Sequence, residues 1–257
     1  MAEETVAQQG ASHSIFSRYK GKYEAQTPET LSFGEYLERC KADPLTYASP
    51  AERMVAALGK PELIDTRKDP RLLSLYGGQP VAKYSAFKGI EGIDDTIEQL
   101  ALFFHKASQN LEEARQVLYF LGPVGSAKST LASMVKNLIQ SQPFYRLKGS
   151  PVNESPLGLF ANDPEMAQVL KEDYGIPDRY LQNTTMSPWA AKRLKEYKGD
   201  ITRFEVEKVY PSVTRQVAVG RTEPGDENNQ DISALVGSVD LRKLEKFEQN
   251  DPDAYSY

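Results

Sequence analysis

The stretch Val117-Leu118-Tyr119-Phe120-Leu121-Gly122-Pro123-Val124-Gly125-Ser126-Ala127-Lys128-Ser129-Thr130 decides the fold that we predict for this chain. Its first five residues are apolar, with β-branched and aromatic members, and predict a buried strand of a parallel sheet. Residues 131–139 then predict an amphipathic helix, because apolar side chains recur there at helical spacing: Leu131, Met134, Val135, Leu138 and Ile139. A glycine-rich turn ending in Lys-Ser joins the two elements, and this order predicts a phosphate-binding P-loop.

Each residue type in the turn suits the binding of a polyphosphate. Gly122 and Gly125 let the main chain turn sharply, so that backbone N–H groups can surround the anion. The helix that begins near Lys128 directs its positive end toward the same place. We expect Lys128 to contact the β and γ phosphates of ATP and the Ser129 hydroxyl to bind Mg²⁺. The predicted nucleotide-binding residues of the turn are Gly122, Pro123, Val124, Gly125, Ser126, Ala127, Lys128, Ser129 and Thr130.

One position departs from the P-loop pattern G-x-x-x-x-G-K-[ST], which has glycine where this chain has Ala127. Alanine resists a positive φ, so a strained loop is one interpretation and a helical backbone at Ala127 is the other. We expect the helical backbone, because Lys128 must begin the helix. The alternative for the whole stretch is an ordinary strand, turn and helix without a ligand.

Composition narrows the class of protein. The 257 residues, 40% of them hydrophobic, suffice for one large or two smaller globular domains. The net charge of −5 gives no support for nucleic-acid binding. The single cysteine, Cys40, fits a reducing compartment and packing in the interior. No apolar run approaches the ~20 residues of a membrane span, and the polar N-terminus is unlike a signal peptide. These features predict a cytoplasmic protein without membrane contact.

Three parts are expected along the chain: a disordered tail at 1–13, a helical N-terminal segment at 14–60 and a P-loop domain at 61–257. Hydrophobic spacing and turn residues predict helices over 14–25, from Leu31 to before Asp43, from Pro50 to Gly59, over 94–106 and 163–174, and from Ser187 onward. Strands are predicted at 64–65, 81–84, 144–147 and 204–209.

Two regions outside the P-loop are candidates for nucleotide chemistry. Ile90 and Ile93 lie just ahead of a predicted helix, about where AAA+ proteins place the adenine pocket; the alternative is that both are core residues. Hydrolysis of ATP also needs an acidic pair after a second apolar strand. The nearest match is Val236-Gly237-Ser238-Val239-Asp240, which glycine and serine interrupt. The acidic loop 223–231 is either a cation or partner site or a solvated loop.

The chain resembles the AAA domain of the PrkA family of bacterial serine protein kinases from about Ile15 to its end. The resemblance rests on specific motifs: Gly122-Pro123-Val124-Gly125, Lys128-Ser129, Ser150-Pro151-Val152-Asn153, Tyr174-Gly175-Ile176-Pro177, the stretch Met186 to Leu194, Thr222-Glu223-Pro224-Gly225-Asp226, the stretch Asn228 to Gly237, and Asn250-Asp251-Pro252-Asp253-Ala254-Tyr255. The chain departs from the family at Ser126 and Ala127, where the family has glycine. Family members are much longer and continue into the acidic strand motif and a kinase-like domain, so we expect a fragment that ends before that motif.

The resemblance implies an α/β fold: an incomplete AAA+-like P-loop NTPase with a three-layer parallel sheet, preceded by the helical segment. It implies an ATP-binding module of a serine protein kinase, with ATP and Mg²⁺ as cofactors, a protein substrate and a homo-oligomeric ring. Two other classes stay open. One is an AAA+ ATPase that remodels or degrades proteins, and the other is a non-catalytic interaction module with a degraded P-loop.

Overall fold

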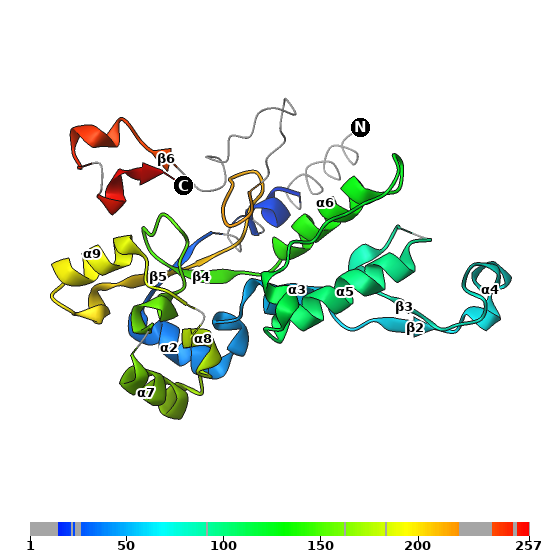
Figure 1. The fold of residues 1–257 in the computed structure, drawn as a ribbon, viewed down its shortest axis with the longest axis horizontal. Helices are drawn as coiled ribbons and strands as arrows, with labels where there is room; N and C mark the ends of the chain where they lie inside the picture. Colours follow the sequence, from blue (N-terminus) through cyan, green and yellow to red (C-terminus); the bar gives the residue numbers. More distant parts are fainter. Residues whose placement is uncertain are drawn as a thin grey trace, which may run out of the picture.

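Two hydrophobic cores organise the computed structural model, which describes residues 15–21, 23, 27–90, 92–161, 163–182, 184–220, 238–248 and 251–256. We call the part around the larger core the sheet lobe and the part around the smaller core the P-loop lobe. The two lobes lie side by side in Figure 1, with α2, α7, α8 and α9 in one and α3, α5 and α6 in the other. The predicted tail at 1–13 and the acidic loop 223–231 lie outside the described residues.

The sheet lobe is built on three antiparallel strands in the order β1-β5-β4, with bounds Glu29–Ser32, Glu205–Val209 and Phe144–Leu147. Leu31, Val206 and Leu147 face one another across the three strands, and all three are buried. The lobe's helices are α2 (Phe33–Ala42), α7 (Pro164–Tyr174), α8 (Arg179–Gln182) and α9 (Pro188–Glu196). The three buried side chains of the sheet, Leu31, Val206 and Leu147, belong to the core against which these helices pack.

The P-loop lobe is helical at its centre. It contains α3 (Pro50–Leu58), α5 (Asp94–Ser108) and α6 (Lys128–Ile139), whose apolar faces meet at Leu58, Ile97, Leu100 and Leu131. The antiparallel hairpin β2 (Glu62–Ile64) and β3 (Val81–Lys83) projects from this core and carries α4 (Pro70–Tyr76) at its far end (Figure 1). The two strands that we predicted near 64 and 81 are therefore confirmed as one hairpin.

Short elements complete the described fold. A third antiparallel sheet joins β6 (Ser238–Val239) to β7 (Tyr255–Ser256), and residues 15–21 are helical. The 3-10 helices are η1 (Pro44–Thr46), η2 (Thr66–Lys68), η3 (Ser85–Phe87), η4 (Glu112–Arg115), η5 (Pro156–Phe160), η6 (Ile201–Arg203), η7 (Lys243–Glu245) and η8 (Pro252–Ala254).

Local signals account for most helix ends. Ser32 and Ser49 each form a capping box with the glutamate three residues on, so α2 and α3 begin where side-chain oxygens satisfy the first backbone N–H groups. Gly59 and Gly175 end α3 and α7 with positive φ, as predicted for glycine at these stops. The start of α2 differs from our expectation by two residues, because Leu31 belongs to β1.

The prediction of a parallel sheet is wrong for the described residues, in which every strand pair is antiparallel. Residues 117–121 form no strand, and Val117, Tyr119 and Leu121 are 91%, 80% and 85% exposed. A strand needs hydrogen-bonding neighbours, and no described strand pairs with this segment. The apolar run by itself therefore predicted a buried strand that the described part of the chain does not form.

Candidate functional site

The predicted P-loop lies at the projecting N-terminal end of α6 (Figure 1). The segment 116–127 reaches this end after η4 and turns at Gly125, whose φ of 85° is one that only glycine adopts freely. The backbone N–H of Ser126 donates to the carbonyl of Pro123 at 3.3 Å and closes the turn. Strand–turn–helix was expected here; turn and helix are present, and the strand is not.

Lys128 is drawn into the turn that precedes it. Its ammonium donates to the carbonyl oxygens of Gly122 and Pro123 at 2.6 and 2.5 Å, and to Ser126 Oγ at 3.0 Å. A Cβ on Gly122 would come within 2.9 Å of Ser126 Oγ, so a larger residue at position 122 would require the Ser126 side chain to move. The lysine and the loop therefore form one compact unit with a positive charge at its centre.

Ala127 has a left-handed backbone, with φ 58° and ψ 12°, which corrects our expectation of a helical backbone. The physical reason is that Ala127 is the N-cap of α6 rather than part of its first turn, so its dihedrals follow the loop. Its carbonyl already accepts the first helical hydrogen bond, from Leu131 at 2.9 Å. Alanine pays a steric cost in this conformation that glycine would not pay.

The first turn of α6 has no side-chain cap. Most described helices in this chain receive a serine or aspartate oxygen at their first N–H groups, whereas Ala127 has none to offer. Ser129 and Thr130 are exposed on the same turn. Uncapped N–H groups beside an ammonium and two hydroxyls form a donor set that suits phosphate oxygens.

Ile90 and Ile93 lie between η3 and α5, and η3 packs against α6. Both side chains are half-buried, and Ile93 packs on the core of the P-loop lobe. The structure therefore brings their segment next to the P-loop helix, as the adenine-pocket interpretation requires. For Ile93, this packing agrees equally well with the alternative that it is a core residue without a ligand.

Asp240, the nearest candidate for a hydrolytic carboxylate, has another role. It follows β6, and its Oδ1 accepts a hydrogen bond from the backbone N–H of Arg242 at 3.0 Å. In Figure 1 β6 lies above the sheet lobe at the upper left, away from the projecting end of α6 at the upper right. Within the described ranges, no three His, Cys, Asp or Glu side chains are grouped so as to hold a metal ion.

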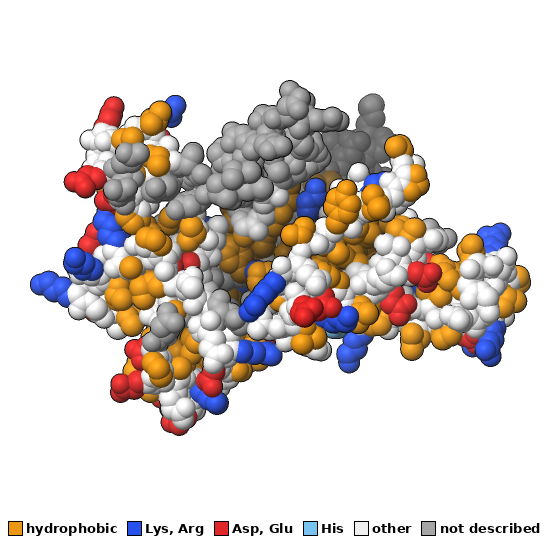
Figure 2. Space-filling view, in the orientation of Figure 1, with side chains coloured by type: hydrophobic (Ala, Val, Ile, Leu, Met, Phe, Trp, Pro, Cys, Tyr) orange, Lys and Arg blue, Asp and Glu red, His pale blue; other side chains and the backbone are white. Residues whose placement is uncertain are grey.

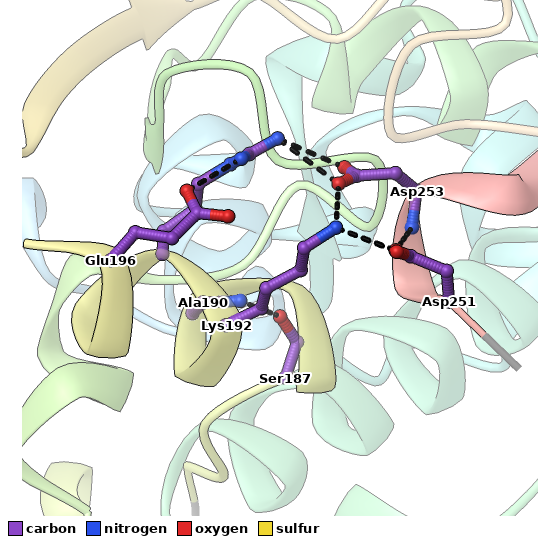
Figure 3. A network of polar contacts seen from close by, with 7 residues as sticks. Ser187, Ala190, Lys192, Glu196, Asp251 and Asp253 are labelled. Atoms are coloured by element: carbon purple, nitrogen blue, oxygen red, sulfur yellow. Dashed lines mark hydrogen bonds and ion pairs between the residues drawn. The ribbon is translucent and has the colours of Figure 1, made fainter. Parts of the chain in front are cut away.

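The motifs around α9 and around residues 251–255 meet in space, which sequence reasoning did not foresee. The Lys192 ammonium donates to Asp251 at 2.7 Å and to Asp253 at 2.6 Å, and Arg193 pairs with Asp253 at 3.1 Å (Figure 3). The basic residues come from α9 and the acidic ones from the turn around η8. We call these four residues the α9 ion-pair cluster.

A second group of hydrogen bonds connects residues 150–154 to the start of α9. Glu154 accepts hydrogen bonds from the backbone N–H and the hydroxyl of Ser187, at 3.0 and 2.7 Å, and from Ser150 Oγ at 3.0 Å. Ser187 in turn caps α9 at the N–H of Ala190 (Figure 3). Several motifs of the resemblance are thus joined to one another by polar contacts.

The chain belongs to the family of PrkA AAA domains, whose family model matches residues 31–257. It is 52% identical over 248 residues to proteins named "Serine/threonine kinase YeaG" from Escherichia coli strains K12 and O157:H7. It is 30% identical over 236 residues to "ATP-dependent protease PrkA" from Bacillus subtilis strain 168. No solved structure matches. The resemblance seen in the sequence is confirmed.

These matches cover 95% and 88% of this chain but only 38% and 34% of the respective relatives. The chain therefore spans little more than a third of the length of those proteins. AAA domains are nucleotide-binding domains, so membership of the family implies that this chain binds a nucleotide. None of the helices in the described part of the chain is long and apolar enough to cross a membrane.

Proposed function

We propose that this chain is the ATP-binding AAA module of a PrkA-type serine protein kinase, and that residues 122–130 hold Mg·ATP. The observation that carries the proposal is the convergence of Lys128 with the carbonyls of Gly122 and Pro123 at the uncapped start of α6. Phosphate oxygens carry more negative charge than these carbonyls. Replacement of these two carbonyl oxygens by phosphate oxygens as hydrogen-bond partners of the Lys128 ammonium is therefore favourable.

Each residue has a defined part in this proposal. Gly122 and Gly125 permit the turn, and the N–H groups of the first turn of α6 donate to phosphate. Lys128 neutralises phosphate charge, and the exposed Ser129 hydroxyl is the protein ligand for Mg²⁺. When bound, ATP supplies the transferable phosphoryl group and Mg²⁺ offsets its charge. The half-buried Ile90 and Ile93 flank the adenine ring.

The test is isothermal titration of Mg·ATP into the wild type and into Lys128→Ala. A charged hydrogen bond is worth ~1.5–3 kcal/mol, so the substitution should weaken binding at least ~10-fold. Lys41→Ala, which removes an exposed lysine from α2 in the other lobe, is the matched control and should bind as the wild type does. Equal affinity for ATP in Lys128→Ala and the wild type would refute the P-loop assignment.

Hydrolysis is not expected from these 257 residues. The sequence has no acidic pair after an apolar strand, and Asp240 is engaged in its own turn. ATP turnover by the chain should therefore equal that of Lys128→Ala in a phosphate-release assay. Turnover clearly above that level would show that a catalytic carboxylate is present, and the acidic loop 223–231 would be the first place to look.

A second candidate function follows from the name of the Bacillus subtilis relative, which is that of an ATP-dependent protease. In that case the module would drive protein unfolding or cleavage rather than transfer phosphate to serine. Assays on a longer protein that contains this chain distinguish the kinase from the protease. Phosphoserine on a protein substrate supports the kinase, and ATP-dependent appearance of new peptide ends supports the protease. A homo-oligomeric ring is proposed for either activity and is measurable by light scattering.

A further inference from the structure

A cavity of about 640 Å³ opens where the two lobes meet. Its wall combines residues of both lobes, including Tyr47, Arg53, Phe104, Ile139, Phe144 and Tyr180. Its size is within the ~300–1,000 Å³ of pockets for small molecules. Apolar and aromatic side chains form much of the wall, so any ligand would need an apolar body.

The cavity is distinct from the proposed nucleotide site. Ile139 lines it and is the last residue of α6, whereas the P-loop precedes the first residue of that helix. A helix of this length separates the two places by roughly 16 Å, at ~1.5 Å per residue. A nucleotide held by residues 122–130 would therefore leave the cavity wall at Arg53 free for another ligand.

Arg53 is the unusual residue of this wall. It lies on α3, its residue is only 8% exposed, and its guanidinium lies 5.2 Å from the centre of the Phe144 ring. The Nε and Nη1 atoms are buried and have no hydrogen-bond partner. Burial lowers the pKa of Arg53 to about 10, so the side chain still carries its positive charge at neutral pH. A buried cation with unused donors is costly unless an anion pairs with it.

The carboxylates in the cavity wall pair with other residues. Glu52, beside Arg53 in the sequence, accepts hydrogen bonds from Arg179 Nη2 at 3.1 Å and from the Tyr180 hydroxyl at 2.5 Å. Glu113 pairs with Lys106 at 3.0 Å. Neither glutamate is a hydrogen-bond partner of Arg53, whose buried Nε and Nη1 donors are unpaired.

We propose that this cavity binds a small organic anion, a carboxylate or phosphate group on an apolar or aromatic body, with the Arg53 guanidinium as the partner of the anionic group. The apolar wall around Phe104, Phe144 and Ile139 accepts the body of the ligand. Arg53 supplies charge and directed donors at the same place, which is how a mostly apolar pocket gains specificity.

The first experiment uses the 257-residue chain without nucleotide and three probes of similar shape: benzoate, phenyl phosphate and neutral benzyl alcohol. Binding is followed by chemical-shift changes in two-dimensional NMR spectra that include the arginine Nε–Hε signals. We expect at least one anion to bind at least ~10-fold more tightly than benzyl alcohol, because a charged hydrogen bond adds about a decade or more of affinity. The shifts should map to α3, α5 and α8 and to Arg53 Nε–Hε. The preference between benzoate and phenyl phosphate distinguishes a carboxylate ligand from a phosphate ligand.

The second experiment compares variants. Arg53→Met keeps an unbranched apolar stem and removes the charge, and should reduce the affinity for the preferred anion at least ~10-fold. Arg71→Met, which changes an exposed arginine on α4, is the control and should leave that affinity unchanged. Lys128→Ala should also leave it unchanged, because the P-loop is a different site.

Three results would overturn the proposal. They are benzyl alcohol binding as tightly as both anions, shift changes that map to the start of α6 and not to the cavity wall, and Arg53→Met binding the anion as the wild type does. If Arg53→Met does not fold, the comparison of charged and neutral probes on the wild type and the Arg53 Nε–Hε shift still decide the question. The structural alternative, that Arg53 only stacks on Phe144, predicts no response of that signal to either anion.

Discussion

The sheet lobe and the P-loop lobe differ in how fully they bury their apolar residues. Among the described residues the larger core holds fifteen buried side chains and the smaller one seven, so the sheet lobe is the better-packed scaffold. In the P-loop lobe the segment before the nucleotide turn exposes Val117, Tyr119 and Leu121, and Val124 at the tip is also exposed. Figure 2 shows hydrophobic side chains on the projecting end of that lobe. The P-loop lobe, which carries the candidate nucleotide site, therefore has the smaller buried core.

Residues of equal hydrophobicity are buried to very different extents in the two lobes. Leu147 in β4 and Leu121 before the P-loop both end segments that we predicted to be strands, yet Leu147 is fully buried and Leu121 is 85% exposed. The free energy that a leucine contributes depends on the area that it removes from water. Sequence alone gives the two leucines the same weight, and only the fold separates them.

The sharpest test of this difference compares Leu147→Ala with Leu121→Ala. Leu147→Ala should lower the free energy of unfolding by ~2–5 kcal/mol, because it removes buried methyl groups and leaves a cavity. Leu121→Ala should change it by less than ~0.5 kcal/mol. Urea denaturation of both variants measures the two values. A large loss in Leu121→Ala would mean that residues 117–121 are buried in solution.

A second test uses the reactivity of Cys40 in the sheet lobe. Burial raises the pKa of this thiol from 9.0 to about 12, so the native protein holds very little reactive thiolate near pH 8. We expect a thiol reagent such as dithionitrobenzoate to react with native Cys40 orders of magnitude more slowly than with the urea-unfolded chain. A Cys40→Ser, Tyr119→Cys double variant places a thiol at an exposed site of the other lobe and should react at once. Fast labelling of native Cys40 would show that the larger core opens readily.

Ala127→Gly tests the strained residue of the P-loop lobe. Glycine removes a left-handed strain of ~1–2 kcal/mol and costs ~0.5–1 kcal/mol in chain entropy, so the protein should gain up to about 1.5 kcal/mol in stability. The matched control Ala132→Gly, inside α6, should instead lose ~0.5–1 kcal/mol. Thermal unfolding of the two variants compares the signs. A loss of stability in Ala127→Gly would contradict the left-handed backbone.

The smallest effect is expected at the α9 ion-pair cluster in acid. The hydrogen bond from the Lys192 ammonium, followed by that from the Asp253 N–H, lowers the pKa of Asp251 below its usual 3.8. A carboxyl whose pKa is lowered by folding adds stability above its unfolded value, and this stability is lost as the pH falls through the folded value. We therefore expect the β6–β7 segment to loosen only below about pH 4. The NMR shift of the Asp240 N–H, which donates to Ala254 O at 2.9 Å, reports the change. In Lys192→Met the same shift should move at higher pH, and an unchanged midpoint would contradict the pairing.

The sequence by itself determined the features that depend on neighbours a few residues apart. The glycine stops at Gly59 and Gly175 and the helix after Lys128 were predicted from the sequence. The serine–glutamate capping boxes at Ser32 and Ser49, which we did not predict, are equally local, because a cap or a turn closes within three or four residues. The motifs around Gly122 to Ser129 and Met186 to Leu194 were also specific enough to indicate the family that the comparison with known domains then confirmed.

Only the tertiary structure decided which of these local elements meet. The antiparallel pairing of β4 with β5 joins residues about sixty positions apart, and the same is true of Lys192 with Asp253. The burial of Arg53 against Phe144 and the left-handed backbone of Ala127 likewise depend on what surrounds each residue. Strand pairing, desolvation and backbone strain are set by contacts between distant parts of the chain, whereas hydrophobic spacing records only that a residue is apolar.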